Sequence, residues 1–561
     1  MKGDFEHPLN LSLELARWLA LASLVTTVFS AFYEVIRHES RLFRLLRKHE
    51  HIIICGLGRV GLQLARDLAA RGEHVVALEP GAHDQNALTA REAGVTVISG
   101  DASDPDDLRR VRVAKAKQVI AVCHDEQTNI AVAAAVGQIL ADPKTTRKLD
   151  QPLECWIFIP DEKLRRVLQQ DRVFPNTNPG SNYKVNVSGM NLFDLAARQV
   201  FTESPLDHNG IGPDDPHVVH LVIVGFGEMG RHLALQAARI GHFANFKKLK
   251  ITVLENKPAA NPRVQSFLDE YKMLPQICDF NVIDLASDMD AVPAQLAALD
   301  KTAASTRERV TFAFCWDSQD ESTASESELL RQLERDDPVN LAWALELRQL
   351  DEHSKAAIVV FQTRARGFGA LFPAKNPGAV LGDRMRAFGM IEQTCSVDSM
   401  LHGREDQIAR AFHSDWLEIQ LKKGRKIGDK PSLQPWEKLT LRLLDSNRHA
   451  ADHIPIKLRA LGYRIAPLDQ APAAATQLSE IKGPDLELLA KMEHQRWWVD
   501  HLLNGYTYAP GDLDDVKKTS GCLVEWDKLD LGTQDYDRNQ VKSIPRILTE
   551  KAKRGIYRQS A

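Results

Sequence analysis

A glycine-rich turn that occurs twice constrains the fold of this 561-residue chain more than any other feature. The first copy, GLGRVG at Gly56–Gly61, follows a short apolar run and precedes a segment with helical periodicity. The second copy places Gly225, Gly227 and Gly230 after the apolar run at residues 220–224. A buried strand, a tight glycine turn and a helix in this order are typical of parallel α/β sheets, so we expect two such lobes in tandem.

The glycines of the first turn have the spacing that cradles a pyrophosphate. Gly56 permits the tight turn, Gly58 lets the backbone approach the phosphates, and Gly61 lets helix and strand pack closely. Glu79 ends the next predicted strand, where a carboxylate accepts ribose hydroxyls and repels a 2′-phosphate. We therefore expect NAD(H), ADP or ATP before NADP, with a binding site formed by Gly56, Gly58, Arg59, Val60, Gly61 and Glu79.

Further polar residues follow the next predicted strands of the first lobe. Asp101, Asp125 and Asn129 come after two apolar runs, and ligands bind at the carboxyl ends of strands in open α/β sheets. In the second lobe we match Glu255 to Glu79, Asp284 to Asp101 and Asp317 to Asp125, whereas residue 321 is glutamate in place of Asn129. The second lobe is therefore either a degenerate copy or a second site formed by Gly225, Gly227, Gly230, Glu255, Asp284 and Asp317.

The stretch from residue 51 to about 136 resembles the RCK family, the TrkA-like N-terminal domains that regulate potassium conductance and uptake. The resemblance rests on the GLGRVG turn, Glu79, the turn at residues 100–102 and the pair Asp125 and Asn129. It implies a lobe that binds an adenine nucleotide and whose motion biases an attached or associated ion pathway. The nucleotide would then be a signal and not a redox reagent.

The segment from Leu11 to Ile36 departs from the pattern of a soluble chain. Its centre, Trp18–Tyr33, is free of charge and spans about 24 Å as a helix, a little less than a hydrocarbon core of about 30 Å. Several basic residues follow it directly, which by the positive-inside tendency places the rest of the chain in the cytoplasm. We expect a single-pass membrane anchor in the cell membrane, with a buried core helix and a signal peptide as the alternatives.

The region after residue 400 contains a duplication of its own. Its first copy aligns with its second at His413 and His494, Trp416 and Trp497, Trp436 and Trp526, Arg448 and Arg538, and Pro455 and Pro545. A nine-residue insertion near residues 506–518 separates the two halves of the second copy. The pattern resembles the RyR domain, a helical repeat named from ryanodine receptors, although Thr519-Ser520-Gly521 replaces the His-Pro of that family.

The second copy is the predicted ligand site of this region. A helix starting near Asp485, a plausible N-cap, and ending near Gly505 would place Leu488, Met492, Val499 and Leu503 on one apolar stripe. Glu493 and Trp497 would lie together on another side, and the insertion adds aromatic and cationic groups. We expect a nucleotide-derived signal to bind Glu493, Trp497, Tyr506, Tyr508 and Lys518, unless the tryptophans only anchor the core.

Composition excludes several classes of function. The net charge of −4 favours no nucleic-acid partner, and the seven cysteines lack metal-ligand spacing, so no metal site is predicted. No placed acid, base or metal marks a catalytic centre, which makes a dehydrogenase an unfavoured alternative.

The predicted domains are an anchor and basic segment (1–48), a first Rossmann lobe (49–201), a linker (202–217), a second Rossmann lobe (218–399) and a mostly helical double repeat (400–561).

These features together predict a membrane-anchored sensor of nucleotides that regulates cation movement, most naturally of potassium. Its expected partners are the lipid bilayer, further copies of the same chain and a cation channel or transporter subunit. A stress or antiphage effector is the alternative from a different class: the RyR-like module would receive a nucleotide-derived signal, and oligomerisation would damage or depolarise the membrane.

Overall fold

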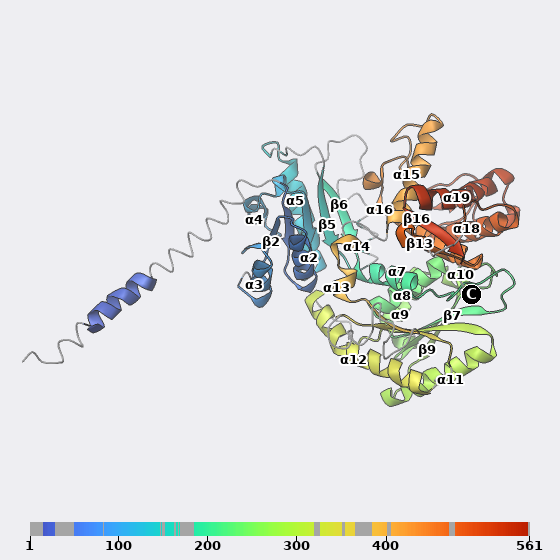
Figure 1. Ribbon diagram of the computed structural model, residues 1–561, viewed down its shortest axis with the longest axis horizontal. Helices are drawn as coiled ribbons and strands as arrows, with labels where there is room; N and C mark the ends of the chain where they lie inside the picture. Colours follow the sequence, from blue (N-terminus) through green and yellow to red (C-terminus); the bar gives the residue numbers. More distant parts are fainter. Residues whose placement is uncertain are drawn as a thin grey trace, which may run out of the picture.

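The computed structural model describes residues 15–27, 50–81, 83–145, 147, 152–161, 164–165, 168, 185–318, 326–350, 354–364, 384–400, 406–470 and 477–558. Two α/β lobes and a helical C-terminal unit make up the body of the molecule (Figure 1). Residues 15–27 form a separate helix whose larger apolar side chains are exposed.

The first lobe is a six-stranded parallel sheet in the order β3-β2-β1-β4-β5-β6. Strands β1 and β2 are buried along their whole length, which explains why their sequences are continuous apolar runs. The strands are β1 (Ile52–Cys55), β2 (Val75–Leu78), β3 (Thr96–Ile98), β4 (Gln118–Ala121), β5 (Leu153–Phe158) and β6 (Val185–Met190). The helices are α2 (Arg59–Ala70), α3 (Gln85–Glu92), α4 (Pro105–Arg110), α5 (Glu126–Ala141) and α7 (Leu192–Glu203).

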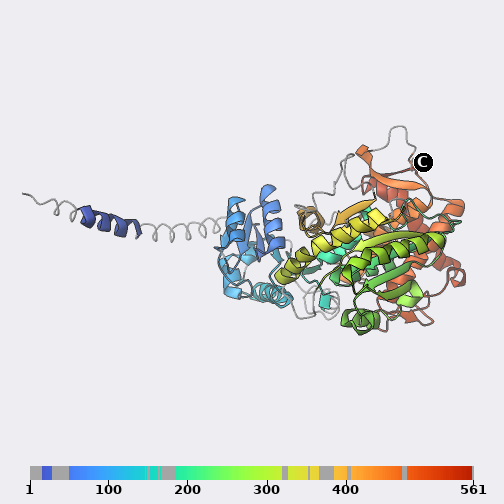
Figure 2. The ribbon, with the colours of Figure 1, turned by 90° about the horizontal axis from the view of Figure 1, so that it is seen from below.

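The second lobe repeats this topology, with the order β12-β11-β10-β7-β8-β9. If β7 is numbered as the first strand, the order is again 3-2-1-4-5-6, so the predicted tandem of parallel α/β lobes is confirmed. Helices α11 and α12 lie side by side along one face (Figure 2). The strands are β7 (Val218–Val224), β8 (Lys250–Glu255), β9 (Asp279–Asp284), β10 (Glu308–Phe314), β11 (Ala357–Phe361) and β12 (Met385–Phe388). The helices are α8 (Glu228–Ile240), α9 (Pro262–Glu270), α10 (Leu274–Ile277), α11 (Val292–Ser305), α12 (Glu326–Leu350), α13 (Ile391–Thr394) and α14 (Val397–Met400).

The C-terminal unit is an internal duplication, as its sequence predicts. The first copy contains α15 (Gln407–Lys422), η7 (Trp436–Lys438), α16 (Leu441–Asp452), α17 (Ile454–Ala460) and β13 (Tyr463–Pro467). The second contains α18 (Gly483–Leu503), η9 (Trp526–Lys528), α19 (Leu531–Glu550) and β16 (Arg554–Arg558), with β14 (Thr507–Tyr508) and β15 (Thr519–Ser520) in the inserted segment. The copies join where β13 pairs with β16 in antiparallel register.

The same histidine contact recurs in both copies. His413 Nε2 lies 2.7 Å from the carbonyl oxygen of Gln434, and His494 Nε2 lies 2.7 Å from that of Val524. Each ring also packs near a tryptophan of its 3-10 helix, with ring centroids 6.1 Å apart for Trp436 and 5.8 Å apart for Trp526. These side chains tie the long helix of each copy to the turn that follows it, which supports the structural interpretation of most of the tryptophans.

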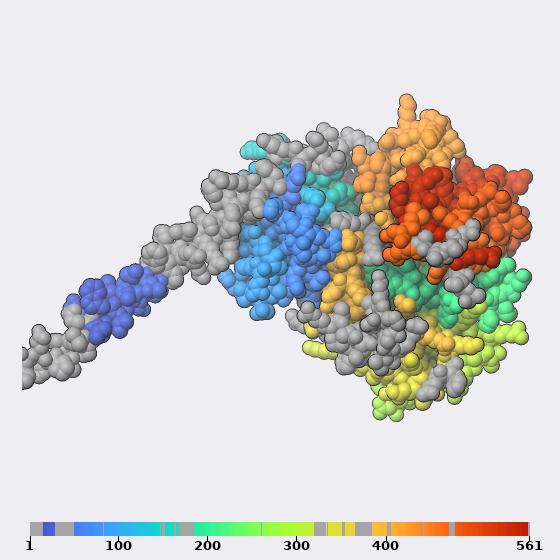
Figure 3. Space-filling view, viewed as in Figure 1, coloured from blue at the N-terminus to red at the C-terminus, as the bar shows by residue number. Residues whose placement is uncertain are grey.

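Buried ion pairs fasten the C-terminal unit to α7 and to the segment that follows it. Arg198 on α7 donates to Asp452 over 2.8 Å and 3.0 Å and to Asp406 over 3.1 Å. Arg459 forms a two-pronged pair with Asp207, which is 1% exposed in the segment between the lobes. The space-filling view shows the C-terminal unit in orange and red packed against the lobes (Figure 3). The lobes and the C-terminal unit therefore form one packed body.

The predicted membrane anchor lies mainly outside the described residues. Of the stretch Leu11–Ile36, the structure describes only residues 15–27. Within the described ranges, no helix combines the length and the apolar character that crossing a bilayer requires.

Candidate functional site

The glycine turn of lobe one leaves an open surface beside the N-terminus of α2. Gly56 has φ +94°, and a Cβ there would lie 2.6 Å from the Val122 carbonyl oxygen. A Cβ at Gly61 would overlap the Gly56 carbonyl oxygen, whereas a Cβ at Gly58 would meet nothing within 4 Å. Gly58 is also the N-cap residue of α2 and carries no side-chain cap. The first and third glycines thus serve packing, and the second leaves room at a helix end that attracts anions.

Glu79 lies against this turn, as the sequence predicts. Its Oε2 accepts a hydrogen bond from the Leu57 N–H over 2.6 Å, and its Oε1 accepts one from the Gly81 N–H over 3.2 Å. The side chain of Asn86 donates to the Leu57 carbonyl oxygen over 2.9 Å, which fixes the turn from the other side. Glu79 remains partly exposed, so its carboxylate keeps lone pairs for a ribose hydroxyl.

Asp101 and Asp125 both lie beyond the carboxyl ends of their strands, but each is engaged locally. Asp101 accepts from the N–H and the hydroxyl of Ser103, over 2.8 Å and 2.7 Å. Asp125 is the N-cap of α5 and accepts from the N–H and the hydroxyl of Thr128. Partial burial raises the pKa of Asp125, yet the hydrogen bonds from Thr128 outweigh it, so the net pKa is lowered. Both residues shape loops at the rim of the site.

Asn129 has a structural role that its sequence position did not suggest. It is 1% exposed, and its Oδ1 accepts from the Cys123 N–H over 2.7 Å. Its Nδ2 donates to the carbonyl oxygen of Phe158 over 3.1 Å. Asn129 therefore joins the ends of β4 and β5 and does not face the open surface at Gly58, contrary to the predicted contact with nucleotide.

In lobe two, a carboxylate occupies the surface that is open in lobe one. A Cβ built at Gly227, the counterpart of Gly58, would overlap the carboxylate of Asp317. Arg263 at the start of α9 pairs with that carboxylate, with Nη1 2.6 Å from Oδ1. The side chain of Asp317 thus places a negative group beside the N-terminus of α8, where a phosphate would otherwise sit.

Glu255 of lobe two repeats the contact of Glu79 but is more deeply buried. Its Oε2 accepts from the Phe226 N–H over 2.7 Å, and the residue is 5% exposed. Burial has the largest effect and raises the pKa of the Glu255 carboxyl, and the negative charge of Asp317 raises it further. The two lobes therefore share one backbone design and differ in access.

Two of the predicted correspondences between the lobes are wrong. Cys55 pairs with Ala121, whereas its counterpart Val224 pairs with Phe314. Counting from these pairs places Asp317 level with His124 and not with Asp125. Asp284 lies inside β9 beside Glu255, whereas Asp101 lies three residues beyond the end of β3. For Asp317, the matched cysteines Cys123 and Cys315 had hidden a one-residue difference in register.

Asn340 and Arg263 were missed by the sequence comparison. Asn340 on α12 accepts from the Trp316 N–H over 2.8 Å and donates to the Trp316 carbonyl oxygen over 3.1 Å, as Asn129 does at Cys123. The intervening insertion placed this asparagine far from residue 321, which lies outside the described residues. Arg263 directly follows Asn261-Pro262, a pattern typical of a helix start, and this helix start comes after a strand that ends in a carboxylate. A basic residue at that position was the signal available in the sequence.

The predicted ligand site on the second C-terminal copy is largely filled by internal contacts. Glu493 is 1% exposed, and its carboxylate pairs with Lys457 over 2.5 Å and with Arg496 over 2.7 Å. The expected separation of one apolar stripe from a polar side is wrong, because α18 buries residues around its whole circumference. The helix also begins at Gly483 after the N-cap Lys482, and not at Asp485.

The insertion residues are also mostly engaged. Tyr506 is 1% exposed and its hydroxyl donates to Asp515 over 2.6 Å, while Lys518 Nζ donates to the Asn504 carbonyl oxygen over 3.1 Å. Tyr508 is exposed, and Trp497 is half-buried with its ring 4.0 Å from that of His501. Gly505 has φ +81°, as its predicted role after the helix end requires. Among the five predicted contacts, Tyr508 is exposed, Trp497 and Lys518 are half-buried, and Glu493 and Tyr506 are buried.

Comparisons with known proteins agree with the first lobe. The sequence model of the TrkA-N domain matches residues 52–167. Potassium channel protein 1 of Methanocaldococcus jannaschii is 22% identical over 121 residues, which are 22% of this chain and 36% of that protein, so the chain spans about a third of that relative. The GsuK RCK domain is 13% identical with a TM-score of 0.36, over 65% of this chain and 79% of that one. The human SLO3 gating ring is 13% identical with a TM-score of 0.35, over 62% and 80%. The match to the TrkA-N domain thus covers the glycine turn and Glu79 of the first α/β lobe.

Proposed function

We propose that lobe one binds NAD(H) or an adenine nucleotide as a signal, and that its occupancy regulates cation movement, most naturally of potassium. The observation that carries the proposal is the open surface at Gly58, bounded by the uncapped start of α2 and by Glu79. The TrkA-N match covers these residues, and the similar archaeal protein is named as a potassium channel.

Contacts of α2 offer a route from the nucleotide to the rest of the chain. Asp67 of α2 accepts a hydrogen bond from the Val397 N–H over 2.8 Å, and Arg71 pairs with Asp398 over 2.7 Å. Val397 and Asp398 begin α14, which connects lobe two to the C-terminal unit. A shift of α2 on nucleotide binding would therefore move the junction of lobe one, lobe two and the C-terminal unit. Such coupling suits a regulatory protein better than an enzyme.

The proposal also includes a membrane anchor and self-association. The apolar segment at residues 11–36 would hold the sensor at the bilayer, with a channel or transporter subunit or further copies of the chain supplying the ion path. We further propose that the C-terminal duplication is an RyR-like repeat, on the strength of its repeated histidine and tryptophan contacts.

Calorimetry with NAD, NADH, ADP and ATP tests the nucleotide site. Gly58→Asp places a carboxylate where Asp317 lies in lobe two, and Glu79→Ala removes the ribose acceptor. A lost charge-assisted contact is worth about 1.5–3 kcal/mol, so we expect roughly ten-fold or greater weakening in each variant. Glu73→Ala, which removes an exposed carboxylate paired with Lys117, is the matched control and should bind as the wild type does. Equal affinity in all four proteins would refute the site.

Rubidium uptake tests the regulatory role. Membrane vesicles prepared from cells that produce the full chain should take up rubidium in a nucleotide-dependent manner. Gly58→Asp should remove this dependence on nucleotide while the protein stays in the membrane fraction. Uptake that is unaffected by nucleotide in the wild type, or equal in both proteins, would contradict the proposed function.

A further inference from the structure

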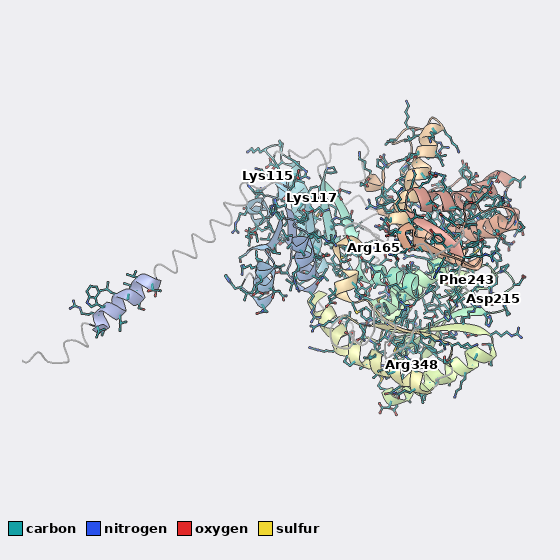
Figure 4. All side chains as sticks on the ribbon, in the orientation of Figure 1. Lys115, Lys117, Arg165, Asp215, Phe243 and Arg348 are labelled. Atoms are coloured by element: carbon teal, nitrogen blue, oxygen red, sulfur yellow. The ribbon has the colours of Figure 1, made fainter. Side chains whose placement is uncertain are left out.

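The turns that follow α15 form a basic tip at residues 421–430. All ten residues of this tip are exposed. The tip belongs to the light-orange segment that projects from the top of the C-terminal unit, and the side chains of that segment extend away from the body of the molecule (Figures 3 and 4). One acidic residue, Asp429, stands against five basic residues, which are Lys422, Lys423, Arg425, Lys426 and Lys430.

The basic side chains of the tip are not used inside the protein. None of the five forms an ion pair with another residue that the structure describes. Elsewhere in the C-terminal unit, by contrast, Arg448 pairs with Asp406 over 2.7 Å. The Asp429 carboxylate accepts a hydrogen bond from the backbone N–H of Lys426 over 2.7 Å, so it stabilises a turn of the tip. The positive charge of the tip therefore remains available to a partner.

Apolar side chains are exposed beside these charges. Leu421 is 38% exposed and Ile427 is 54% exposed. The second C-terminal copy shows that the repeat does not require this exposure, because Leu502 and Leu503, which align with Leu421 and Lys422, are only 8% and 9% exposed. The first copy thus has a lysine where its duplicate buries a leucine, and it leaves its own leucine in water. Apolar side chains that gather on a surface in this way indicate an interaction site.

Two glycine turns give the tip a defined shape. Gly424 has φ +83° and follows the end of α15, and Gly428 has φ +94°. The Gly428 N–H donates to the carbonyl oxygen of Leu433 over 2.9 Å, and Leu433 is fully buried, so the chain that leaves the tip is tied to the core. A preformed surface loses little conformational entropy when it binds a partner.

A flat anionic surface suits this projecting tip better than a small ligand does, because its charges are spread over a protrusion and do not line a pocket. Lysine and arginine side chains can reach the phosphates of lipid headgroups. The exposed Leu421 and Ile427 can enter the boundary between the headgroups and the acyl chains. The combination of cations and apolar groups is therefore the one that an anionic bilayer recognises.

The tip also projects on the side where the chain enters the body. The N–H of Glu50, where the described body begins, donates to the Lys115 carbonyl oxygen over 2.9 Å. Lys115 lies in the upper part of lobe one, and the tip lies at the top of the same view (Figure 4). We propose that residues 421–430 dock on anionic lipid headgroups and hold the C-terminal unit against the bilayer, an inference that rests on the proposed function in that the predicted anchor brings the chain to the membrane.

Fluorescence quenching on vesicles tests the docking with the full chain. Cys522, the one cysteine that is not buried, is replaced by Cys522→Ser, and Ile427→Cys then carries a bimane label. The protein is reconstituted into phosphatidylcholine spin-labelled near its headgroup, with or without phosphatidylglycerol. We expect strong quenching only when phosphatidylglycerol is present, and loss of that quenching at high salt, because salt screens exposed charges.

A four-fold variant removes the charge of the tip and should be quenched no more on the anionic vesicles than its parent is in phosphatidylcholine alone. Its substitutions are Lys422→Gln, Lys423→Gln, Arg425→Gln and Lys426→Gln. The matched control removes the same number of exposed cations from lobe two and should be quenched as its parent is. Its substitutions are Lys272→Gln, Lys301→Gln, Arg307→Gln and Lys355→Gln. Melting temperatures establish that each variant is folded.

The proposal is overturned if the label is quenched equally with and without phosphatidylglycerol, if it is quenched in neither, or if the four-fold variant of the tip is quenched as strongly as its parent. Equal losses in that variant and the control would also overturn it, because net charge alone would then explain the binding. Flotation of the same samples tests the anchor separately. A chain without an anchor would not float with pure phosphatidylcholine, yet its label would still be quenched on the anionic vesicles.

Discussion

The contact between His242, which lies just after α8, and His453, which lies just before α17, should weaken in mild acid because it buries neutral histidines. The backbone carbonyl oxygen of His242 lies 2.8 Å from Nε2 of His453. Burial lowers the pKa of His242 from 6.5 to about 4, and the charges of Arg496 and Lys457 add to this, while the hydrogen bond to the Ala238 carbonyl oxygen opposes it. Burial, the largest effect, and the charge of Lys457 also hold the pKa of His453 well below its usual range.

The sign follows from the direction of the shift. The folded pKa is depressed, so the unfolded chain takes up a proton first as the pH falls below 6.5, and the stability is lost progressively between pH 6.5 and pH 4. For His242 alone, linkage between these two values gives a loss of about 2 kcal/mol between pH 7 and pH 5. This corresponds to about a thirty-fold rise in local opening.

Hydrogen exchange of peptides from α8 and α17, corrected for the intrinsic effect of pH, measures this opening. His242→Gln keeps a donor for Ala238 but cannot titrate, so its opening should rise about thirty-fold less than that of the wild type between pH 7 and pH 5. His83→Gln, at an exposed position, is the control and should behave as the wild type does. Equal acid sensitivity in His242→Gln and wild type would refute the assignment to this histidine.

Two further substitutions test the packing. Glu493→Ala leaves Lys457 and Arg496 buried without their shared carboxylate, so it should lower the free energy of unfolding in urea by about 3–5 kcal/mol. The control Glu487→Ala breaks an exposed pair with Arg538 and should cost less than about 1 kcal/mol. Similar losses in the two variants would contradict a buried structural role for Glu493. Gly61→Ala should cost about 1–3 kcal/mol because its Cβ would overlap the Gly56 carbonyl oxygen, and Gly58→Ala should leave the unfolding midpoint almost unchanged, so equal midpoints for the two variants would show that the turn can relax.

The sequence predicted the parts of the fold that depend on local patterns. Apolar runs, glycine turns and strand-end carboxylates are short-range features, so both sheets and the position of Glu79 at the end of the strand after the first turn were predictable without a structure, whereas its hydrogen bond to Leu57 was not predicted. The C-terminal duplication was also visible, because a histidine and a tryptophan recur in register with each other.

The errors arose where partners come from distant segments. A helical wheel of α18 shows that Glu493 lies next to Trp497. It cannot show Lys457 of α17, whose ammonium group pairs with the buried carboxylate of Glu493. Likewise, matching letters aligned Asp317 with Asp125, whereas strand pairing, which depends on neighbouring strands, sets the true register. A cavity between β5 and the first C-terminal copy had no signal in the sequence, because the residues of its two walls are more than 200 positions apart along the chain.

Asp317 provides the sharpest test of how the two lobes differ. Its carboxylate occupies the surface at Gly227 and is held there by Arg263, whereas the equivalent surface at Gly58 is open. Wild-type protein should therefore bind one adenine nucleotide per chain, in lobe one. Asp317→Ala removes the internal anion and leaves the guanidinium of Arg263 beside the start of α8, so a phosphate can take the vacated place.

Calorimetry of Asp317→Ala with the nucleotide that binds the wild type should show two sites per chain. Combining it with Gly58→Asp should leave one site, in lobe two, which separates a new site from altered binding in lobe one. Asp284→Ala is the control, because Asp284 accepts from the Lys257 N–H, whereas the three atoms nearest a Cβ at Gly227 all belong to Asp317, so this variant should keep one site. Two sites in the wild type would show that lobe two is not blocked at all. One site in Asp317→Ala would show that the Asp317 carboxylate does not decide access, and the difference between the lobes would then lie in the buried Glu255.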